Sequence, residues 1–409
     1  MKRYQKFMYW MMAFFLIIGC YSFLCGVERQ QVEAAKGDRV IDGVFVVNGT
    51  KLRDYTGKAE HVVVPDGITS IGRSAFASCK AKTIALPNSV VEIESCSFQY
   101  ASSLEKVTFS KNVKKIGSMA FWDCEKLREI SSMKGVEEIG SSAFFNTIWL
   151  KEKQKQNPLV IVNTILVDGS ACKGEVEVPN TVTKTGEDAF DFNEELTSIT
   201  IPNSVKEIGG GCFHGCRYLR TVKMGDGVEK IGSQAFRYCT RLKNIRLSKS
   251  LKEIDSLTFE ICSRLEEITI PDSVEVLSIQ AFYGCKKLKS ITLPNSFKIL
   301  DGLGALGVYD VKVTVYGQDV DKNLWIRKIA EENEVEVKEL ALTDSKKRLK
   351  QNETYRLKFN SGAKCTWKSS NRSVATVNHY GIITTNEKGT ATITAHLNGR
   401  DYTCKIIVE

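Results

Sequence analysis

A phenylalanine returns at a nearly constant interval of 23 residues along most of this chain, always in the same local frame. Counted from a residue five positions earlier, the frames begin at Ile71, Ile93, Ile116, Ile139, Thr185, Ile208, Ile231, Ile254 and Leu277. The phenylalanines are Phe76, Phe98, Phe121, Phe144, Phe190, Phe213, Phe236, Phe259 and Phe282, each after a small residue. Such a period predicts a repeat solenoid, because one unit cannot bury its own apolar residues and must stack on the next.

A leucine follows most of these phenylalanines six residues later, and an Ile or Val usually comes three residues after it, as Leu242 and Ile245 illustrate. The pattern Leu-x-x-Ile-x-Leu predicts a short strand with alternating inward residues. Prolines such as Pro202 and Pro271 then end the strand, since proline cannot extend a backbone ladder. Each repeat is therefore predicted to be one coil of short parallel strands, turns and short helices.

These repeats resemble the 23-residue leucine-rich repeats of the BspA-like type, which occur in bacterial surface proteins. The resemblance covers roughly residues 40–335, with the repeats themselves at 71–300. Segments 35–70 and about 151–184 are versions of one another and look like that family's hairpin insertions, the first serving as an N-terminal cap. "DKNLWIRKIAEEN" predicts an amphipathic helix at about 321–333, so that 301–340 would cap the last coil.

The last segment, 341–409, changes pattern and resembles the group 2 bacterial immunoglobulin-like (BIG2) module. The matching stretches are "TWKSSN" from Thr366, "VATV" from Val374 and "GTATIT" from Gly389. The resemblance implies a small all-β immunoglobulin-like sandwich, with Trp367 in its core and a role as a spacer or adhesion domain.

Cys365 and Cys404 both fall in this predicted sandwich. A disulfide between them is one prediction for a secreted protein, and strands too far apart for a bond are the alternative.

Residues 1–34 predict a signal peptide. A basic start at 2–6 precedes an almost wholly apolar run at 8–23, and the small-residue pattern ending at Ala34 predicts cleavage there. The alternatives are a lipobox that makes Cys20 a lipidated first residue, and an uncleaved anchor. The mature protein is thus expected to be secreted or to lie on the bacterial cell surface, with membrane attachment only through a lipidated Cys20.

Cysteines recur in one column of the repeat, where other units carry Ala, Thr or Asn. They are Cys79, Cys124, Cys216, Cys239, Cys262 and Cys285. A column that accepts all these types predicts a slot for a small, weakly polar side chain facing backbone groups, and so buried free thiols. Disulfides between stacked coils remain an alternative. "CFHGC" from Cys212 to Cys216 suggests zinc, but the repeat register explains both cysteines by packing.

No catalytic residues are predicted. The chain lacks a Gly-x-Ser-x-Gly elbow, a His-Glu-x-x-His pair and a Walker loop, which argues against an enzyme and against cofactors or a metal. With 57 Lys and Arg against 48 Asp and Glu, the formal charge of +9 is too mild to single out nucleic acid, so no nucleic acid is expected among the partners.

Two surface features are candidates for ligand binding. Arg220, Lys223, Lys243 and Arg246 flank the inward residues of two adjacent strands and predict a small basic surface, here called the cation patch. It is either neutralised by Glu266 and Glu267 next door or kept for an acidic protein segment or anionic glycan. The second feature is a set of aromatic residues just after the repeat phenylalanines, for which partner binding and packing between coils are both open. They are Tyr100, Trp122, Phe145, Phe192, Tyr238 and Tyr283.

The resemblance to BspA-like proteins implies a non-catalytic, adhesin-like binding protein that recognises proteins or glycans through a solenoid face. The partners it implies are host extracellular matrix or epithelial proteins, glycans or other bacterial surface molecules. One alternative is a structural envelope protein that binds the producer's own wall polymers. Another is an inhibitor or accessory module of a secreted hydrolase.

Overall fold

The computed structural model describes residues 37–131, 133–278, 280–294, 299–300, 306, 308, 313–317, 319, 331, 335–397 and 399–409. The predicted signal peptide 1–34, including Cys20, and all but one residue of the predicted helix at about 321–333 lie outside these ranges.

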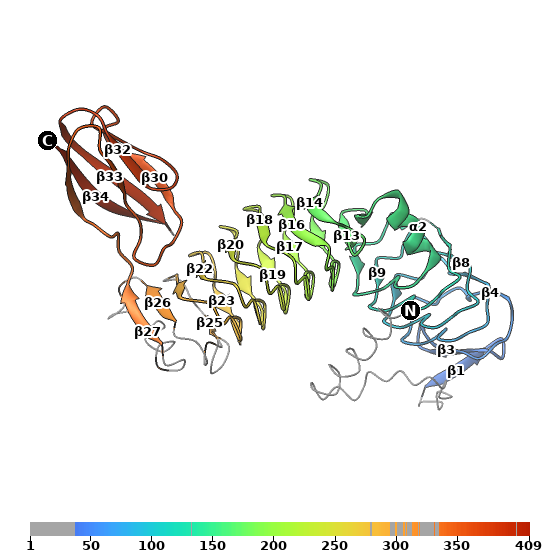
Figure 1. The fold of residues 1–409 in the computed structure, drawn as a ribbon. Coiled ribbons are helices and arrows are strands. Elements are labelled where there is room, and N and C mark those ends of the chain that lie inside the picture. Colours follow the sequence, from blue (N-terminus) through green and yellow to red (C-terminus); the bar gives the residue numbers. More distant parts are fainter. Residues whose placement is uncertain are drawn as a thin grey trace.

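The repeats form a solenoid whose coils stack in one row (Figure 1). Each coil gives a two-residue strand to one side, here called the narrow face. These strands are β5 (Ser70–Ile71), β7 (Glu92–Ile93), β9 (Lys115–Ile116), β11 (Glu138–Ile139), β15 (Lys184–Thr185), β17 (Glu207–Ile208), β19 (Lys230–Ile231), β21 (Glu253–Ile254), β23 (Val276–Leu277) and β25 (Ile299–Leu300). They pair in parallel with the strand one repeat away, which confirms the predicted solenoid of short parallel strands.

The other side, here called the broad face, carries longer strands that fall into three separate four-stranded sheets. The first sheet contains β4 (His61–Val63), β6 (Thr83–Ala85), β8 (Lys106–Thr108) and β10 (Glu129–Ile130). The second contains β14 (Gly174–Glu177), β16 (Leu196–Ile201), β18 (Thr221–Met224) and β20 (Asn244–Arg246). The third contains β22 (Glu267–Thr269), β24 (Ser290–Thr292), β26 (Thr314–Gly317) and β27 (Glu336–Glu339).

All nine repeat phenylalanines are fully buried and stack ring on ring inside the solenoid. The centroids of Phe213 and Phe236 are 5.2 Å apart, and those of Phe236 and Phe259 are 5.5 Å apart with nearly parallel planes. The small residue before each ring leaves room for its neighbour, as the close packing of protein interiors requires. The repeat pattern thus predicted the core residue by residue.

Each coil turns its chain through two left-handed residues, one two positions before the phenylalanine and one two positions after it. In the coil of Phe213 these are Gly211 and Gly215, with φ angles of 59° and 67°. Other coils use residues with side chains, and Ile261 holds a φ of 57° there. A β-branched residue in this conformation is strained, so the stacking of neighbouring coils must offset a local cost.

Two insertions carry antiparallel strands into the narrow face. β1 (Asp38–Ile41), β2 (Phe45–Asn48) and β3 (Lys51–Tyr55) form the N-terminal hairpins, and the ring of Tyr55 lies 5.2 Å from that of Phe76. The second pair is β12 (Val160–Val162) and β13 (Ile165–Asp168). In the turn after β13, a Cβ on Gly169 would come within 2.2 Å of the Phe190 ring, so only glycine fits there.

Helix α2 (Ile148–Gln156) was not predicted, because Leu150 fits the repeat as a strand leucine. The structure instead starts a helix after Thr147, whose hydroxyl accepts a hydrogen bond from the Leu150 N–H at 3.1 Å as an N-cap. Trp149 of this helix packs against Phe144, with ring centroids 4.5 Å apart. The first phenylalanine stack therefore ends at Trp149, and the buried residues form two separate clusters that meet between Ile165 and Leu166.

The C-terminal segment is a two-sheet β-sandwich, as predicted. One sheet has the order β28 (Lys346–Leu349), β34 (Arg400–Val408), β33 (Gly389–Leu397) and β30 (Thr366–Ser369). The other has the order β29 (Thr354–Arg356), β32 (Ile382–Thr385) and β31 (Ala375–Val377). Trp367 is partly buried and packs against the core of the sandwich.

The proposed disulfide between Cys365 and Cys404 is not formed, and both thiols are free. Cys404 lies on β34 opposite Ile393, whereas Cys365 directly precedes β30. Strand β33 runs between β34 and β30, so the two cysteines belong to strands that are not neighbours. This corrects the prediction, since a disulfide needs adjacent Cα atoms.

Candidate functional site

The structure brings the four residues of the cation patch together on two neighbouring coils of the broad face. Lys223 on β18 lies directly opposite Arg246 on β20, because the parallel register pairs these two positions. Arg220 and Lys243 each come just before the same two strands, and all four side chains are exposed. The 23-residue spacing therefore predicted this arrangement.

Half of the cation patch is neutralised within the protein. Arg246 forms an ion pair with Asp226 at 2.6 Å and also donates to the Met224 carbonyl at 2.9 Å. Lys243 pairs with Glu266 at 3.3 Å, as one alternative predicted. Arg220 and Lys223 have no acidic partner within the described part of the chain, and they remain the exposed charge of the site.

Asp226 is the site residue that sequence reasoning missed. Burial opposes its ionisation, but the hydrogen bonds and positive charges of Arg246 and Lys249 together outweigh it and lower the pKa of Asp226, so the carboxylate is charged at neutral pH. Asp226 lies in the turn that follows β18, whereas the repeat pattern predicted only positions in and next to the strands. Aligning the turns as well as the strands would have found it.

The basic charge of the chain is concentrated around the cation patch. Residues 217–249 contain nine Lys and Arg against two acidic residues, whereas residues 250–275 contain two against seven. Adjacent stretches of the same solenoid thus carry opposite charge. The net charge of the solenoid therefore changes sign between the coil of β20 and the coil of β22.

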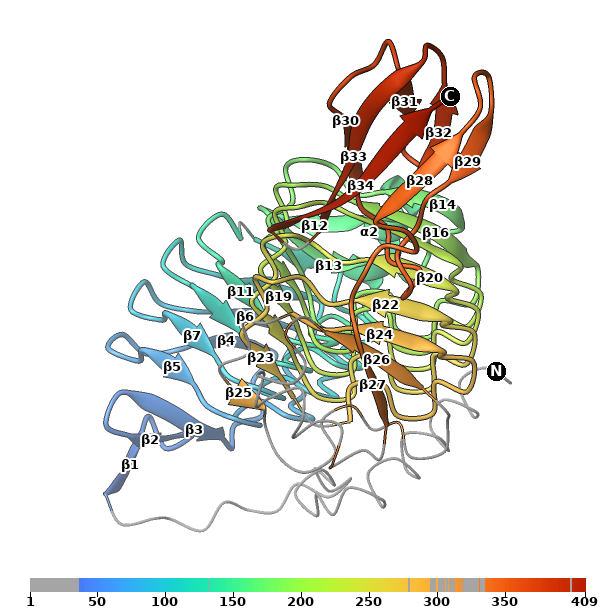
Figure 2. The same cartoon turned by 90° about the vertical axis from the view of Figure 1, so that its left-hand side faces the viewer.

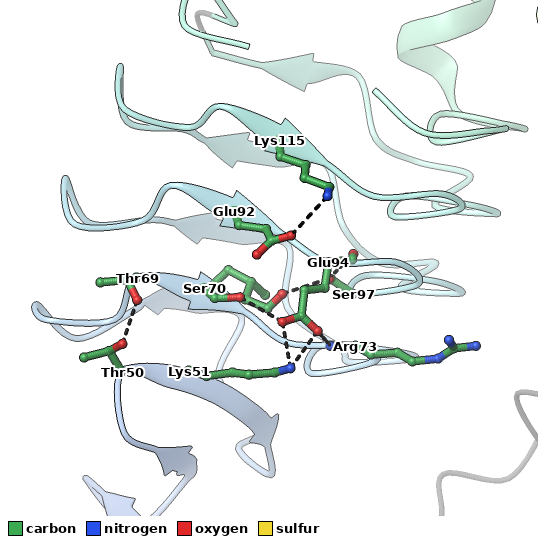
Figure 3. A network of polar contacts seen from close by, with 10 residues as sticks. Thr50, Lys51, Thr69, Ser70, Arg73, Glu92, Glu94, Ser97 and Lys115 are labelled. Atoms are coloured by element: carbon green, nitrogen blue, oxygen red, sulfur yellow. Dashed lines mark hydrogen bonds and ion pairs between the residues drawn. The ribbon is translucent and has the colours of Figure 1, made fainter. Parts of the chain in front are cut away.

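The narrow face differs because its charges pair with each other along the coils. Lys115 lies 3.7 Å from Glu92 and 3.5 Å from Glu138, and Lys184 lies 2.8 Å from Glu207. At the N-terminal end, Lys51 and Ser70 both bond Glu94, and these contacts outweigh burial and lower the pKa of Glu94 (Figure 3). Such cross-strand pairs stabilise the stack and leave little charge for a partner.

Packing accounts for most of the aromatic candidates. Trp122 is buried and stacks on Phe145 with centroids 4.2 Å apart, and Phe192 meets His214 edge-on at 4.9 Å. Tyr100 and Tyr283 are the most exposed of the set, at 39% and 38%. The aromatic residues therefore act mainly as contacts between coils.

The cysteine column is the predicted slot facing backbone carbonyls, and its six thiols are buried and free. The Sγ of Cys239 donates to the Phe213 carbonyl at 3.2 Å, and the Sγ of Cys216 donates to the Phe190 carbonyl at 3.1 Å. Where the column holds Thr147, its hydroxyl donates to the Phe144 carbonyl at 2.8 Å. This confirms the prediction of buried free thiols, and the stacked disulfides are not formed.

The sequence "CFHGC" places His214 beside an acid rather than beside its two cysteines. His214 Nδ1 lies 2.7 Å from a carboxylate oxygen of Asp191, while Cys212 and Cys216 are buried in the core. No group of three or more metal-ligating side chains gathers among the described residues.

Asp188 joins the two halves of the solenoid, since it accepts a hydrogen bond from Ser141 across the insertion. Burial, aided by the negative charge of Asp191, raises the pKa of Asp188 to about 6. The folded state thus holds this proton more tightly than the unfolded chain does. The contribution to stability is complete below the unfolded pKa of about 3.9 and is lost as pH rises through about 6.

Asp188→Asn is therefore expected to raise the free energy of unfolding at pH 7 by about 1–2 kcal/mol. At this pH burial and the charge of Asp191 disfavour the ionised carboxylate of Asp188, and asparagine carries no charge. Urea unfolding at pH 4 and pH 7 measures the effect, and the gain should nearly vanish at pH 4. Asp66→Asn, an exposed carboxyl of the first coils, is the control for loss of charge alone. An equal gain at both pH values would contradict the expectation.

Two family comparisons match the two parts of the fold. Residues 52–165 and 183–302 match the BspA type leucine rich repeat region in six copies. Residues 350–397 match the immunoglobulin-like domain of intimin. The comparison with curated proteins gave no match.

Several solved structures share this likeness. A leucine-rich repeat protein of T. pallidum is 28% identical, with 40% of this chain and 81% of that chain covered and a TM-score of 0.34. A leucine-rich cell surface protein of Faecalibacterium prausnitzii is 22% identical, with 71% and 96% covered and a TM-score of 0.30. The pneumococcal vaccine antigen PcpA is 16% identical, with 73% and 95% covered and a TM-score of 0.42.

Within the ranges that the structure describes, no helix has the length and apolarity to cross a membrane. The repeat match covers more than half of the residues and coincides with the stacked coils. The chain belongs to the BspA type leucine-rich repeat family.

Proposed function

We propose that this protein is a non-catalytic, adhesin-like binding protein that is secreted or displayed on the bacterial surface. The solenoid supplies a rigid, elongated surface, and proteins of this kind bind macromolecules along such surfaces. The immunoglobulin-like domain at the C-terminal end fits a spacer or a second contact point. The expected partners are host matrix or epithelial proteins, glycans or other bacterial surface molecules.

The observation that carries this proposal is the exposed charge of Arg220 and Lys223. Like charges stacked on neighbouring coils are mildly unfavourable, and elsewhere the protein pairs its charges, as Lys106 does with Glu129 at 2.6 Å on the same face. A cation pair left without an acidic partner in the described chain is explained by a ligand that supplies the negative charge.

Binding of the protein to arrays of matrix proteins, mucins, glycans and bacterial wall polymers tests the proposal. The variant Arg220→Glu/Lys223→Glu is expected to bind its partner about tenfold or more weakly at low salt, with a reduced salt dependence. Lys286→Glu/Lys287→Glu changes the charge equally at two exposed residues of the turn before β24 and is the matched control. Equal binding by both variants and the unaltered protein would remove the cation patch from the proposal.

The same array separates the alternative function, which is a structural envelope protein that binds the producer's own wall polymers. The basic stretch 217–249 also suits such polyanions. Salt-sensitive binding to wall polymers alone, without any host component, would favour this alternative.

A further inference from the structure

A cavity of about 500 Å³ lies between the solenoid and the immunoglobulin-like domain. Its solenoid wall comes from β20 and β22, and its other wall comes from residues 363–366 together with His396, Leu397 and Gly399. Figure 1 shows the domain standing beside the coils that carry β22 and β26, and the turned view in Figure 2 places it over the same end. The volume is in the range of small-ligand and side-chain pockets.

The two domains touch beside this cavity. Ser290 of β24 donates to the Ser361 carbonyl at 3.0 Å. Gly362 is required next to it, because its φ is +79° and a Cβ there would lie 2.5 Å from the Glu267 carboxylate. Burial raises the pKa of Glu267, while the charge of Lys364 across the gap acts in the opposite direction.

The cavity lies where the sheet of the broad face is interrupted. β20 ends one sheet and β22 begins the next, although their coils remain joined through β21 on the narrow face. Backbone hydrogen bonds also join neighbouring coils at the ends of the broad-face strands. One runs from the Ile270 N–H, just after β22, to the Thr292 carbonyl at the end of β24, at 2.8 Å. Between β20 and β22, the Glu266 N–H donates to the Lys243 carbonyl at 3.3 Å, at the start of the two strands. The cavity lies against the other ends of these two strands, at Leu247 and Thr269.

The inner lining of the cavity is mostly apolar, with Ile245, Ile268 and Leu397 among its residues. Arg246 belongs both to this lining and to the cation patch, where it lies opposite Lys223. The patch and the cavity are thus one continuous surface. Only one coil spacing of about 4.8 Å separates the strand of Lys223 from the cavity mouth, a distance that two residues of extended peptide span.

We propose that this surface binds one extended peptide segment in which acidic residues are followed by apolar ones. The acidic side chains lie over Arg220 and Lys223, and the apolar side chain enters the cavity between β22 and the immunoglobulin-like domain. A peptide fits better than an anionic glycan, because only the peptide offers an apolar group for this lining. The inference rests on the proposed function and names the class of its partner.

Two synthetic peptides and one polyanion serve as probes. The peptides are Ser-Glu-Glu-Ser-Leu-Leu and Ser-Glu-Glu-Ser-Ser-Ser, each labelled with a fluorophore, and the polyanion is heparin. Thr366→Trp places a large ring in the cavity, because Thr366 is exposed at its wall. Thr403→Trp is the matched control, since Thr403 is exposed on β34 of the same sheet and does not line the cavity.

The unaltered protein is expected to bind the leucine peptide about tenfold more tightly than the serine peptide, because burying one leucine accounts for at least that factor. Thr366→Trp should remove this preference and Thr403→Trp should keep it. Arg220→Glu/Lys223→Glu should weaken both peptides by a similar factor.

The outcomes distinguish the two proposals. Loss of binding in Arg220→Glu/Lys223→Glu, with equal affinity for both peptides in the unaltered protein, would uphold the patch and overturn the cavity. A leucine preference that Thr366→Trp removes, together with peptide affinities that the double variant leaves unchanged, would uphold the cavity and overturn the patch. Heparin binding that depends on Arg220 and Lys223, with no peptide bound, would assign the surface to anionic glycans and overturn the peptide.

Discussion

Replacing Phe236 with alanine is expected to lower the free energy of unfolding by about 3–5 kcal/mol. The ring is fully buried and stacks on Phe213 and Phe259, so its removal leaves a cavity shared by two coil interfaces. In a solenoid these nearest-neighbour contacts supply most of the stability, which makes a central coil costly to weaken. Urea unfolding followed by circular dichroism measures the loss.

Tyr283→Ala is the control for this prediction. Tyr283 directly follows another repeat phenylalanine but is 38% exposed, so a loss of about 1 kcal/mol or less is expected there. A loss of the same size for both variants would show that the phenylalanine stack does not dominate the stability of the solenoid.

The second large effect concerns the ion pair of Arg237 and Glu260, which join adjacent coils. Both side chains are largely buried. Arg237 Nη2 donates a hydrogen bond to Glu260 Oε1 at 3.2 Å. Glu260→Ala is expected to destabilise the protein by about 3–5 kcal/mol, because it leaves a buried guanidinium without its carboxylate. Arg237→Met/Glu260→Leu should instead be close to neutral, since it removes both charges and keeps the volume.

The comparison with an exposed pair completes this test. Lys206 and Glu229 also join adjacent coils at 2.9 Å, but each side chain is more than half exposed. Glu229→Ala is expected to cost below about 1 kcal/mol. If Glu260→Ala costs no more than Glu229→Ala, burial is not what gives the first pair its importance.

The repeat frame predicted the solenoid because one rule governs every coil. The position of Phe236 in the frame implies its burial, its partners one repeat away and the slot of Cys239 nearby. Helix α2 escaped prediction because Leu150 satisfies two patterns, and the cap at Thr147 decides between them only through its hydrogen bond. The sequence left two alternatives open for Cys365 and Cys404, because strand order in the sandwich is not encoded in spacing, and the structure has the one without a disulfide.

The candidate site was predictable only in part. Register placed Lys223 beside Arg246, because both occupy the same repeat column. Asp226 lies in a turn, where the repeat does not fix the direction of the side chain. The cavity depends on how the immunoglobulin-like domain rests on the solenoid, and the one sequence trace of that contact is Gly362.

The break between the two core clusters has a mechanical consequence for the solenoid. On either side of it, phenylalanine rings are stacked without interruption, but among the described residues no ring bridges the step from Trp149 to Phe190. The halves meet through the β12 and β13 hairpin and polar contacts, such as that from Asn163 to the Val136 carbonyl at 2.7 Å. Stretched between its ends, the solenoid should extend first at this seam, so that each half stays folded while the tether between them lengthens.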